Sequence, residues 1–260
     1  MGRRSTPRSP LTAEARRAVD RAFRALGDPR ARLNLPWLSR LLGVAPGALS
    51  EVLSELEELV PVETEIRQRL RDAGRSYYAQ FRAPFELYAF VRWVRPDHVV
   101  ETGVSSGVSS AHLLLALAKN RKGTLHSIDQ PTSQRGPTFS SRDSPVALPP
   151  GRTSGWAVPE RLRDRWDLRI GPSERLLPDL CRKTAAVGVF LHDSLHTPGH
   201  LTFELATVRP RLVAGGVVLA DNTVWTGQAF PRFAASLGAP VRGRGRTDLV
   251  GIRVPSGRGR

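Results

Sequence analysis

Residues 98–107 read HVVETGVSSG, an apolar run that ends in an acidic residue and then turns through two glycines. The run predicts a β-strand over His98–Glu101, and the apolar residues after the turn predict a helix over Ser109–Ala118. Glycine lets the backbone turn tightly and approach a ligand closely. The free N–H groups at the start of the helix point into the same space. This strand–turn–helix therefore predicts a cradle for a small molecule.

Apolar strands alternate with helical segments after this point, which is typical of a parallel sheet covered by helices on both faces. Two short strands at the end of the chain are separated only by Gly243–Thr247, so they predict an antiparallel hairpin. We expect an α/β fold with a doubly wound, mostly parallel seven-stranded sheet and this antiparallel terminal hairpin. The remaining expected strands are Thr124–Ile128, Asp167–Ile170, Val187–Leu191, Val217–Ala220, Pro240–Arg242 and Leu249–Val254, and the further helices are Ser173–Leu180 and Leu201–Leu212.

Helical periodicity before the first strand predicts an N-terminal helical extension of the sheet domain. The domain division that we expect is a disordered basic tail at 1–10, the extension at 11–80, a ligand-binding domain at 81–254 and a second basic tail at 255–260. Within the sheet domain, residues Gln130–Gly155 are rich in Pro, Ser and Gly and predict a long loop. The helices expected before the sheet are Leu11–Leu26, Trp37–Leu42, Leu49–Leu59 and Phe85–Val94.

Composition places the chain among globular proteins, because 40% of its 260 residues are hydrophobic and no apolar run is long enough to span a bilayer. The N-terminal residues 1–10 are basic and contain no apolar segment, so we do not expect a secretory signal. Cys181 is the only cysteine, which excludes an internal disulfide and favours a cytoplasmic location. The amphipathic N-terminal helices are candidate contacts of a homodimer.

The net charge of +15 raises the question of a nucleic-acid partner. Almost all of the positive charge is arginine, and it is spread along the chain, which favours a compositional bias over a binding stripe. We therefore do not expect nucleic acid, although affinity for an anionic partner stays open. The arginines are densest at Arg3–Arg8, Arg161–Arg169, Arg242–Arg246 and Arg258–Arg260.

Polar residues follow the expected strands at their carboxyl ends, which is where open α/β sheets bind ligands. Glu101 ends the first strand, Asp129 the second, and His192-Asp193 and Asp221-Asn222 follow two later strands. An acidic residue at the second of these positions can accept both hydroxyl groups of a ribose. A simple turn residue is the alternative for Asp129. With the glycine turn upstream, the pattern favours a ligand that contains adenosine.

The spacing Glu101-x-Gly103-x-x-x-Gly107 differs from the G-x-G-x-x-G of dinucleotide-binding proteins. It resembles the E/D-x-G-x-x-x-G motif of class I S-adenosylmethionine-dependent methyltransferases. The terminal hairpin and the segment Leu212–Ala220, LVAGGVVLA, also resemble that family. The resemblance covers about residues 80–254, and it implies the sheet described above with S-adenosylmethionine as cofactor.

The chain is also similar to the O-methyltransferases of the catechol and caffeoyl-CoA type and to their macrolide- and sugar-modifying relatives. In that pattern a serine near the methionine carboxylate follows the glycine turn, an acid binds the ribose, and a G-x-S segment, here Gly171-Pro172-Ser173, lies beside the adenine. The cofactor-binding residues that the resemblance implies are Glu101, Gly103, Ser105, Gly107, Ser109, Asp129, Ser173 and Asp193.

The same relatives hold a divalent metal on an Asp after the fourth strand and an Asp-Asn pair after the fifth. The corresponding residues here are Asp193, Asp221 and Asn222, whose oxygens suit Mg²⁺. Alternatively, Asp193 acts as a catalytic or cofactor-binding residue without a metal. His196 stands where the catechol enzymes have a lysine, and it is the expected general base, while His192 and His200 are alternatives.

These observations predict methyl transfer from S-adenosylmethionine to a hydroxyl group of a small molecule, with assistance from a divalent metal. Trp156 and Trp225 are expected either to line the acceptor pocket or to pack at the rim of the sheet. One alternative is an RNA methyltransferase, although no RNA-binding module and no Asn-Pro-Pro-Tyr motif is recognisable. Another alternative is a non-catalytic, regulatory protein that only binds S-adenosylmethionine.

Overall fold

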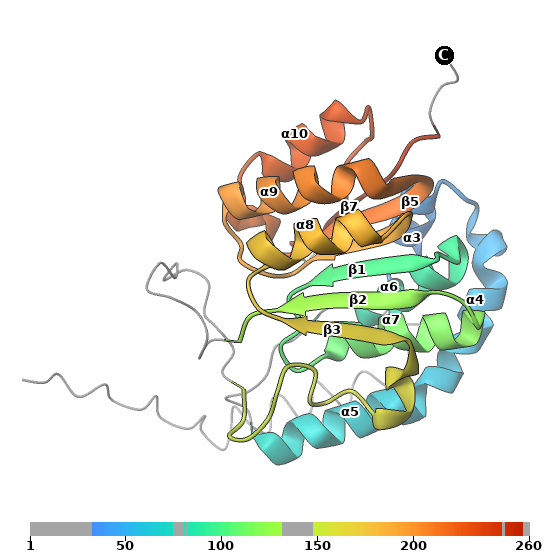
Figure 1. Cartoon of the computed structure of the whole chain (residues 1–260). Helices are drawn as coiled ribbons and strands as arrows, with labels where there is room; N and C mark the ends of the chain where they lie inside the picture. Colours follow the sequence, from blue (N-terminus) through green and yellow to red (C-terminus); the bar gives the residue numbers. More distant parts are fainter. Residues whose placement is uncertain (1–32, 75–80, 82, 132–147, 246–247, 257–260) are drawn as a thin grey trace, which may run out of the picture.

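The computed structural model describes residues 33–74, 81, 83–131, 148–245 and 248–256 (Figure 1). The expected helix Leu11–Leu26, the tail at 1–10, most of the long loop and the last four residues lie outside these ranges. Within them, helices cover both faces of one sheet (Figure 1). None of the helices in these ranges is long and apolar enough to cross a membrane.

The sheet has seven strands in the order β3-β2-β1-β4-β5-β7-β6. The first five strands in the sequence are parallel, whereas β7 runs antiparallel to β5 and to β6. The expected doubly wound, mostly parallel sheet with an antiparallel terminal hairpin is therefore confirmed. The strands are β1 His98–Thr102, β2 Thr124–Asp129, β3 Trp166–Ile170, β4 Val187–His192, β5 Leu212–Ala220, β6 Arg242–Gly243 and β7 Val250–Arg253.

The order of the strands reverses at β1, which pairs with β2 on one side and with β4 on the other. Such a switch point leaves a crevice at the carboxyl ends of these strands. On one face, α6 (Pro84–Val94) and α7 (Val108–Asn120) share a core with the N-terminal helices. On the other face, α8 (Ser173–Lys183), α9 (Pro198–Val208) and α10 (Ala229–Ser236) form the second core.

The structure corrects two details of the last third of the chain. The expected helix Leu201–Leu212 ends at Val208, because Pro210 lies in a short 3₁₀ turn, Arg209–Arg211, that leads out of the helix. Leu212 is already the first residue of β5, which is longer than the expected strand Val217–Ala220. Helix α10 was not expected, and its buried Phe230 packs into the second core.

The N-terminal helical extension is present, but its second helix is not continuous. The expected helix Leu49–Leu59 is a succession of short turns, namely the 3₁₀ turn Pro46–Leu49, α4 (Ser50–Ser54) and the 3₁₀ turn Glu55–Leu59. The chain then continues as α5, Val60–Ala73, with a proline in its first turn, where the missing N–H group is tolerated. The expected helix Trp37–Leu42 lies within α3, Leu35–Leu42.

The extension packs against the sheet domain through buried polar bonds as well as apolar side chains. The buried carboxylate of Glu55 accepts hydrogen bonds from Tyr88 Oη at 2.7 Å and from Arg92 Nε at 2.6 Å, both on α6. On α3, Trp37 Nε1 donates to the carbonyl oxygen of Arg242 at 2.9 Å. The apolar sides of these N-terminal helices are thus buried within the chain itself.

Candidate functional site

The glycine turn after β1 has a backbone that side chains would obstruct. Gly103 and Gly107 have φ angles of +87° and +92°. A Cβ atom on Gly103 would lie 1.9 Å from the carbonyl oxygen of Asp193, so the turn presses directly against the residue that follows β4. Ser105, between the glycines, also has a positive φ of 48°. The turn therefore has the tight, close-approaching backbone that its sequence predicts.

The segment before β3 covers the glycine turn. The N–H groups of Gly155 and Ala157 donate to the carbonyl oxygens of Ser105 and Ser106 at 2.8 and 3.0 Å. Trp156, between these two donors, is 8% exposed and belongs to the core on the α6–α7 face. Of the two uses expected for this tryptophan, the structure therefore shows packing.

Glu101 is fully buried and is held by serine hydroxyl groups. Ser109, Ser110 and Ser127 donate to its carboxylate at 2.5, 2.6 and 2.7 Å. Burial raises the pKa of Glu101 to about 7, and the serine hydroxyl groups oppose this rise. The structure thus brings the expected cofactor residues Glu101 and Ser109 together, but it pairs them with each other. Their contact with a cofactor stays a prediction.

Asp129 lies at the carboxyl end of β2, beside the glycine turn. Its carboxylate accepts a hydrogen bond from the N–H of Val104 at 3.1 Å and another from the hydroxyl of Ser154. Its own carbonyl oxygen accepts from the N–H of Gly171 at 2.9 Å, which ties the end of β2 to the end of β3. Asp129 is therefore more than a solvated turn residue, while its role toward a ribose stays a prediction.

Ser173 is the first residue of α8, and it lies on the side of the crevice next to β3 and β2. Its hydroxyl is 3.1 Å from Nε2 of His200, which is on α9. The structure therefore connects this expected adenine-side residue to the helix that follows β4.

Asp193 and Asp221 follow neighbouring strands and lie close together. The N–H of Asp193 donates to the carbonyl of Thr102 at 2.8 Å, and that of Asp221 donates to the carbonyl of His192 at 2.9 Å. Burial raises the pKa of Asp193 to about 7, His196 opposes the rise, and the negative charge of Asp221 adds to it. Two carboxylates that disfavour each other's ionisation form a site that a cation would stabilise.

The donor chemistry of this pair suits a divalent metal. Carboxylate oxygens, together with the amide of the neighbouring Asn222, are the hard donors that Mg²⁺ requires. No group of three or more His, Cys, Asp and Glu side chains that could hold a metal occurs in the described part of the chain. The residue types at this pair are those that a hard cation prefers, and both the metal and its coordination by these residues stay predictions.

His196 lies beside this pair, with Nε2 3.5 Å from Oδ1 of Asp193. Its ring is 8% exposed and packs edge-on between His192 and Trp225, at centroid distances of 5.5 and 5.9 Å. Trp225 is 43% exposed, so it forms the outer side of this arrangement. Asp193, His196 and Asp221 thus come together as the sequence predicts, with one tryptophan beside them.

Glu204, on α9, is a residue of this region that the sequence pattern did not single out. It is fully buried beneath the ends of β1 and β4, and its carboxylate accepts from Thr102, His192, Ser194 and His200. Although burial opposes its ionisation, the two histidines hold the pKa of Glu204 well below its usual range. A signal existed, because this residue lies on the apolar stripe of α9 formed by Leu201, Leu205 and Val208.

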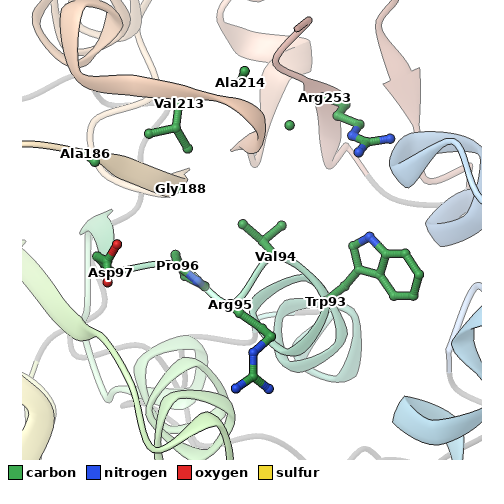
Figure 2. Close-up of a pocket in the computed structure, with 11 residues that line it drawn as sticks. Trp93, Val94, Arg95, Pro96, Asp97, Ala186, Gly188, Val213, Ala214 and Arg253 are labelled. Carbon is green, nitrogen blue, oxygen red and sulfur yellow. The ribbon is translucent and has the colours of Figure 1, made fainter.

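A pocket of about 360 Å³ lies at the opposite, amino-terminal ends of the central strands (Figure 2). Its lining includes the segment Trp93–Asp97 before β1, Gly188 near the start of β4, and Arg253 of β7 (Figure 2). Because β1 and β4 point away from it, this pocket is at the other edge of the sheet from the glycine turn and Asp193. It is therefore separate from the candidate site.

Comparison with known proteins agrees with this geometry. Residues 100–223 match the sequence model of a family described as "Methyltransferase domain". A search of curated proteins finds no match. The matched segment begins in β1 and ends just after Asp221-Asn222, so it contains both the glycine turn and the Asp193–Asp221 pair.

Solved structures of methyltransferases have the same fold. The methyltransferase PaMTH1 of Podospora anserina, solved with bound SAH (S-adenosylhomocysteine), is 16% identical with a TM-score of 0.51, and the match covers 97% of this chain and 100% of that one. The O-methyltransferase TomG of Streptomyces achromogenes, solved with S-adenosylmethionine (SAM), is 17% identical with a TM-score of 0.50, covering 75% and 89%. The O-methyltransferase NovP is 17% identical with a TM-score of 0.51, covering 66% and 77%.

The likeness to these structures shows the fold, and the family match shows a methyltransferase domain over residues 100–223. On these grounds residues 100–223 form a methyltransferase domain, and the chain has the fold of these methyltransferases.

Proposed function

We propose that this methyltransferase transfers its methyl group to a hydroxyl oxygen of a small molecule, with assistance from Mg²⁺. The observation that carries the proposal is the convergence of Asp193, His196 and Asp221 at the carboxyl ends of β4 and β5. The carbonyl of Asp193 fills the space beside Gly103, so this cluster adjoins the turn that we assign to the cofactor. The O-methyltransferases TomG and NovP, which have the same fold, support an oxygen as acceptor.

In the proposed cofactor half, Gly103, Ser105 and Gly107 let the backbone approach the methionine part of S-adenosylmethionine. The carboxylate of Asp129 accepts hydrogen bonds from the ribose hydroxyl groups. In the structure the hydroxyl of Ser154 donates to one of its two oxygens. Glu101 and Ser109 belong to the proposed cofactor site at the base of the turn, where Ser109 donates a hydrogen bond to the carboxylate of Glu101. Ser173 lies beside the adenine. The assignments of Ser105, Ser109 and Ser173 follow from the resemblance to the O-methyltransferases, and that of Asp129 is also supported by its place at the end of β2 beside the glycine turn.

In the proposed acceptor half, the oxygen of the substrate attacks the methyl carbon of the sulfonium ion as its O–H bond breaks. The C–S bond breaks in the same step, its electrons return to sulfur, and S-adenosylhomocysteine leaves. His196 accepts the hydroxyl proton at a ring nitrogen, and Asp193 stabilises the resulting imidazolium from 3.5 Å. Mg²⁺, when held by Asp193, Asp221 and Asn222, would lower the pKa of the acceptor hydroxyl.

The experiment that tests this function follows radiolabelled methyl transfer from S-adenosylmethionine to a panel of catechols, phenols and sugar nucleotides, with Mg²⁺ or with excess chelator. We expect transfer to at least one hydroxyl acceptor, its loss in chelator, and restoration by added Mg²⁺. Asp221→Ala should abolish the Mg²⁺-dependent transfer, whereas Asp164→Ala, which changes an exposed acidic residue in the 3₁₀ turn before β3, is the matched control. Transfer that persists in chelator would remove the metal from the mechanism.

The same experiment separates the two alternatives. Labelled RNA in place of the panel, with binding measured over a salt titration, tests an RNA acceptor. The arginines around β3 favour the small molecule, because Arg161 and Arg169 pair with Glu65 and Asp167 at 2.6 and 2.7 Å. Binding of S-adenosylmethionine in a calorimeter without transfer to any acceptor would favour the regulatory, non-catalytic protein.

A cytoplasmic location and a homodimer through the N-terminal helices also remain predictions. Large apolar side chains of the expected helices Trp37–Leu42 and Leu49–Leu59, among them Trp37 and Leu56, are buried within the chain. A dimer through the described part of the extension, residues 33–74, would therefore use its exposed surfaces. Light scattering on the full chain at two concentrations measures the mass and decides the oligomeric state.

A further inference from the structure

The carboxylate of Glu204 is a junction beneath the site, buried from solvent and bonded on both oxygens. Oε2 accepts from Thr102 Oγ1 at 2.7 Å and from His192 Nδ1 at 2.7 Å. Oε1 accepts from Ser194 Oγ at 3.0 Å and from His200 Nε2 at 2.9 Å. These four partners come from the end of β1, the end of β4, the connection after β4, and α9 itself. One side chain therefore holds together the elements that carry the proposed acceptor half.

The hydrogen bonds assign the protons of the two histidines. His200 lies between carboxylates, because Nε2 faces Glu204 and Nδ1 is 3.1 Å from Oε1 of Glu174. Both ring nitrogens then carry protons, and the cation balances the buried charge of Glu204. These carboxylates also raise the pKa of His200, although burial opposes this rise.

His192 makes its hydrogen bond to Glu204 through Nδ1, so the proton of the neutral ring is on that nitrogen. The ring is fully buried, and no described residue hydrogen-bonds to Nε2, which is left as an acceptor. The ring of His196 stands edge-on against His192, with an interplanar angle of 87°. The Glu204 carboxylate thus fixes the ring on which the proposed base packs.

We propose that Glu204 is a positioning residue for methyl transfer: it holds His192 as the Nδ1–H tautomer, and through that ring it sets the orientation of His196. The proposal rests on the proposed function, in which His196 receives the proton of the acceptor. A buried acid that orients a histidine, which in turn serves the reaction, is an arrangement that hydrolases also use. Here Glu204 acts on His196 indirectly, because it bonds His192 and the ring of His192 packs against His196.

Glu204→Gln is the informative variant because it keeps the shape of the side chain. It replaces one of the two acceptor oxygens by an NH₂ group and removes the charge that balances His200. The Nδ1–H of His192 or the Nε2–H of His200 then loses its acceptor, and one of the two rings must change its protonation. Thr102→Val is the matched control, because it removes one donor to the same carboxylate but leaves the charge and both histidine contacts in place.

The tautomers are read by ¹⁵N NMR of the full chain labelled at its six histidines, with the signals assigned by single histidine substitutions. We expect Nδ1–H and a bare Nε2 for His192 in the parent and in Thr102→Val, and two protonated nitrogens for His200. In Glu204→Gln at least one of these two rings should change its state. Turnover of this variant at saturating cofactor should fall about 10- to 100-fold, with KM for the acceptor and affinity for S-adenosylmethionine little changed.

The proposal is overturned if His192 of the parent carries its proton on Nε2 or on both nitrogens. A folded Glu204→Gln protein with the parent's histidine spectrum and turnover also overturns it. If this variant fails to fold, Glu204→Asp takes its place. An Nδ1–H signal for His192 in Glu204→Asp, together with part of the parent's turnover, supports positioning. If the parent itself transfers no methyl group while its histidine spectrum is as expected, the proposed function fails and the assignment of the protons at Glu204 stands.

Discussion

Replacing Gly103 by alanine should disturb both halves of the site, because the added methyl group has no space. A Cβ at this position would lie 1.9 Å from the carbonyl oxygen of Asp193 and 2.9 Å from the N–H nitrogen of Ser194. Both are backbone atoms, so the clash can be relieved only if the end of β4 moves. The φ angle of +87° adds strain of about 1–2 kcal/mol for any L-residue. With overpacking of about 1–3 kcal/mol, the free energy of unfolding should fall by about 2–5 kcal/mol.

Gly151→Ala separates the strain from the clash. Gly151 also has a positive φ, +72°, but nothing lies within 4 Å of its hypothetical Cβ. It should lose only the strain contribution, about 1–2 kcal/mol. Urea unfolding of the two variants measures the difference, and calorimetry with S-adenosylmethionine measures binding. Gly103→Ala should lose cofactor binding as well as stability, while Gly151→Ala keeps binding. Equal unfolding midpoints for the two variants would refute the reasoning.

Three further changes test the buried acids. The pKa of Glu101 is about 7 when folded against 4.5 unfolded, so its own contribution to stability is greatest at low pH and should fall by up to about 3 kcal/mol as the pH rises to 7; the difference in the free energy of unfolding between the parent and Glu101→Gln, measured by urea titrations, should show this fall. Arg92→Met strands the carboxylate of Glu55 and should cost about 3–5 kcal/mol by urea unfolding, so an unchanged midpoint would contradict the buried pair. Asp129→Asn should weaken S-adenosylmethionine binding about tenfold or more in a calorimeter, whereas Ser154→Ala should not.

The layout of the sheet could be predicted because its signals are local. The strand His98–Glu101 and the helix after it are contiguous in sequence, and the acids Asp129 and Asp193 stand directly after apolar strands. Parallel strands bring such ends to one edge wherever the strands lie in the sheet, so their convergence requires no contact information. The strand ends were therefore enough to group Asp193 with Asp221, whereas His196 joined them through the resemblance to the catechol enzymes.

The internal bonds of the site could not be predicted in the same way. Glu101 is held by Ser127, which comes from the neighbouring strand, and Glu204 is held by Thr102, which lies far away in the sequence. Neither pairing follows from spacing, because the register of β1 and β2 decides the first and the packing of α9 against the sheet decides the second. The helix boundary near Pro210 was missed for a different reason, namely that the helical spacing of apolar residues continues from Val208 across Pro210 to Leu212, the first residue of β5. A pattern of apolar residues alone does not distinguish a buried helix from a buried strand.

The two halves of the site form one unit because the ends of β1 and β4 are joined twice. On the backbone, the N–H of Asp193 donates to Thr102, and its carbonyl occupies the space that glycine leaves free at position 103. Through side chains, Thr102 and His192 share one oxygen of Glu204. A displacement of the cofactor turn must therefore move Asp193 and also loosen the carboxylate that orients His192. The mobility of the acceptor half is thus limited by the turn that we assign to the cofactor, although some ninety residues separate the two in the sequence.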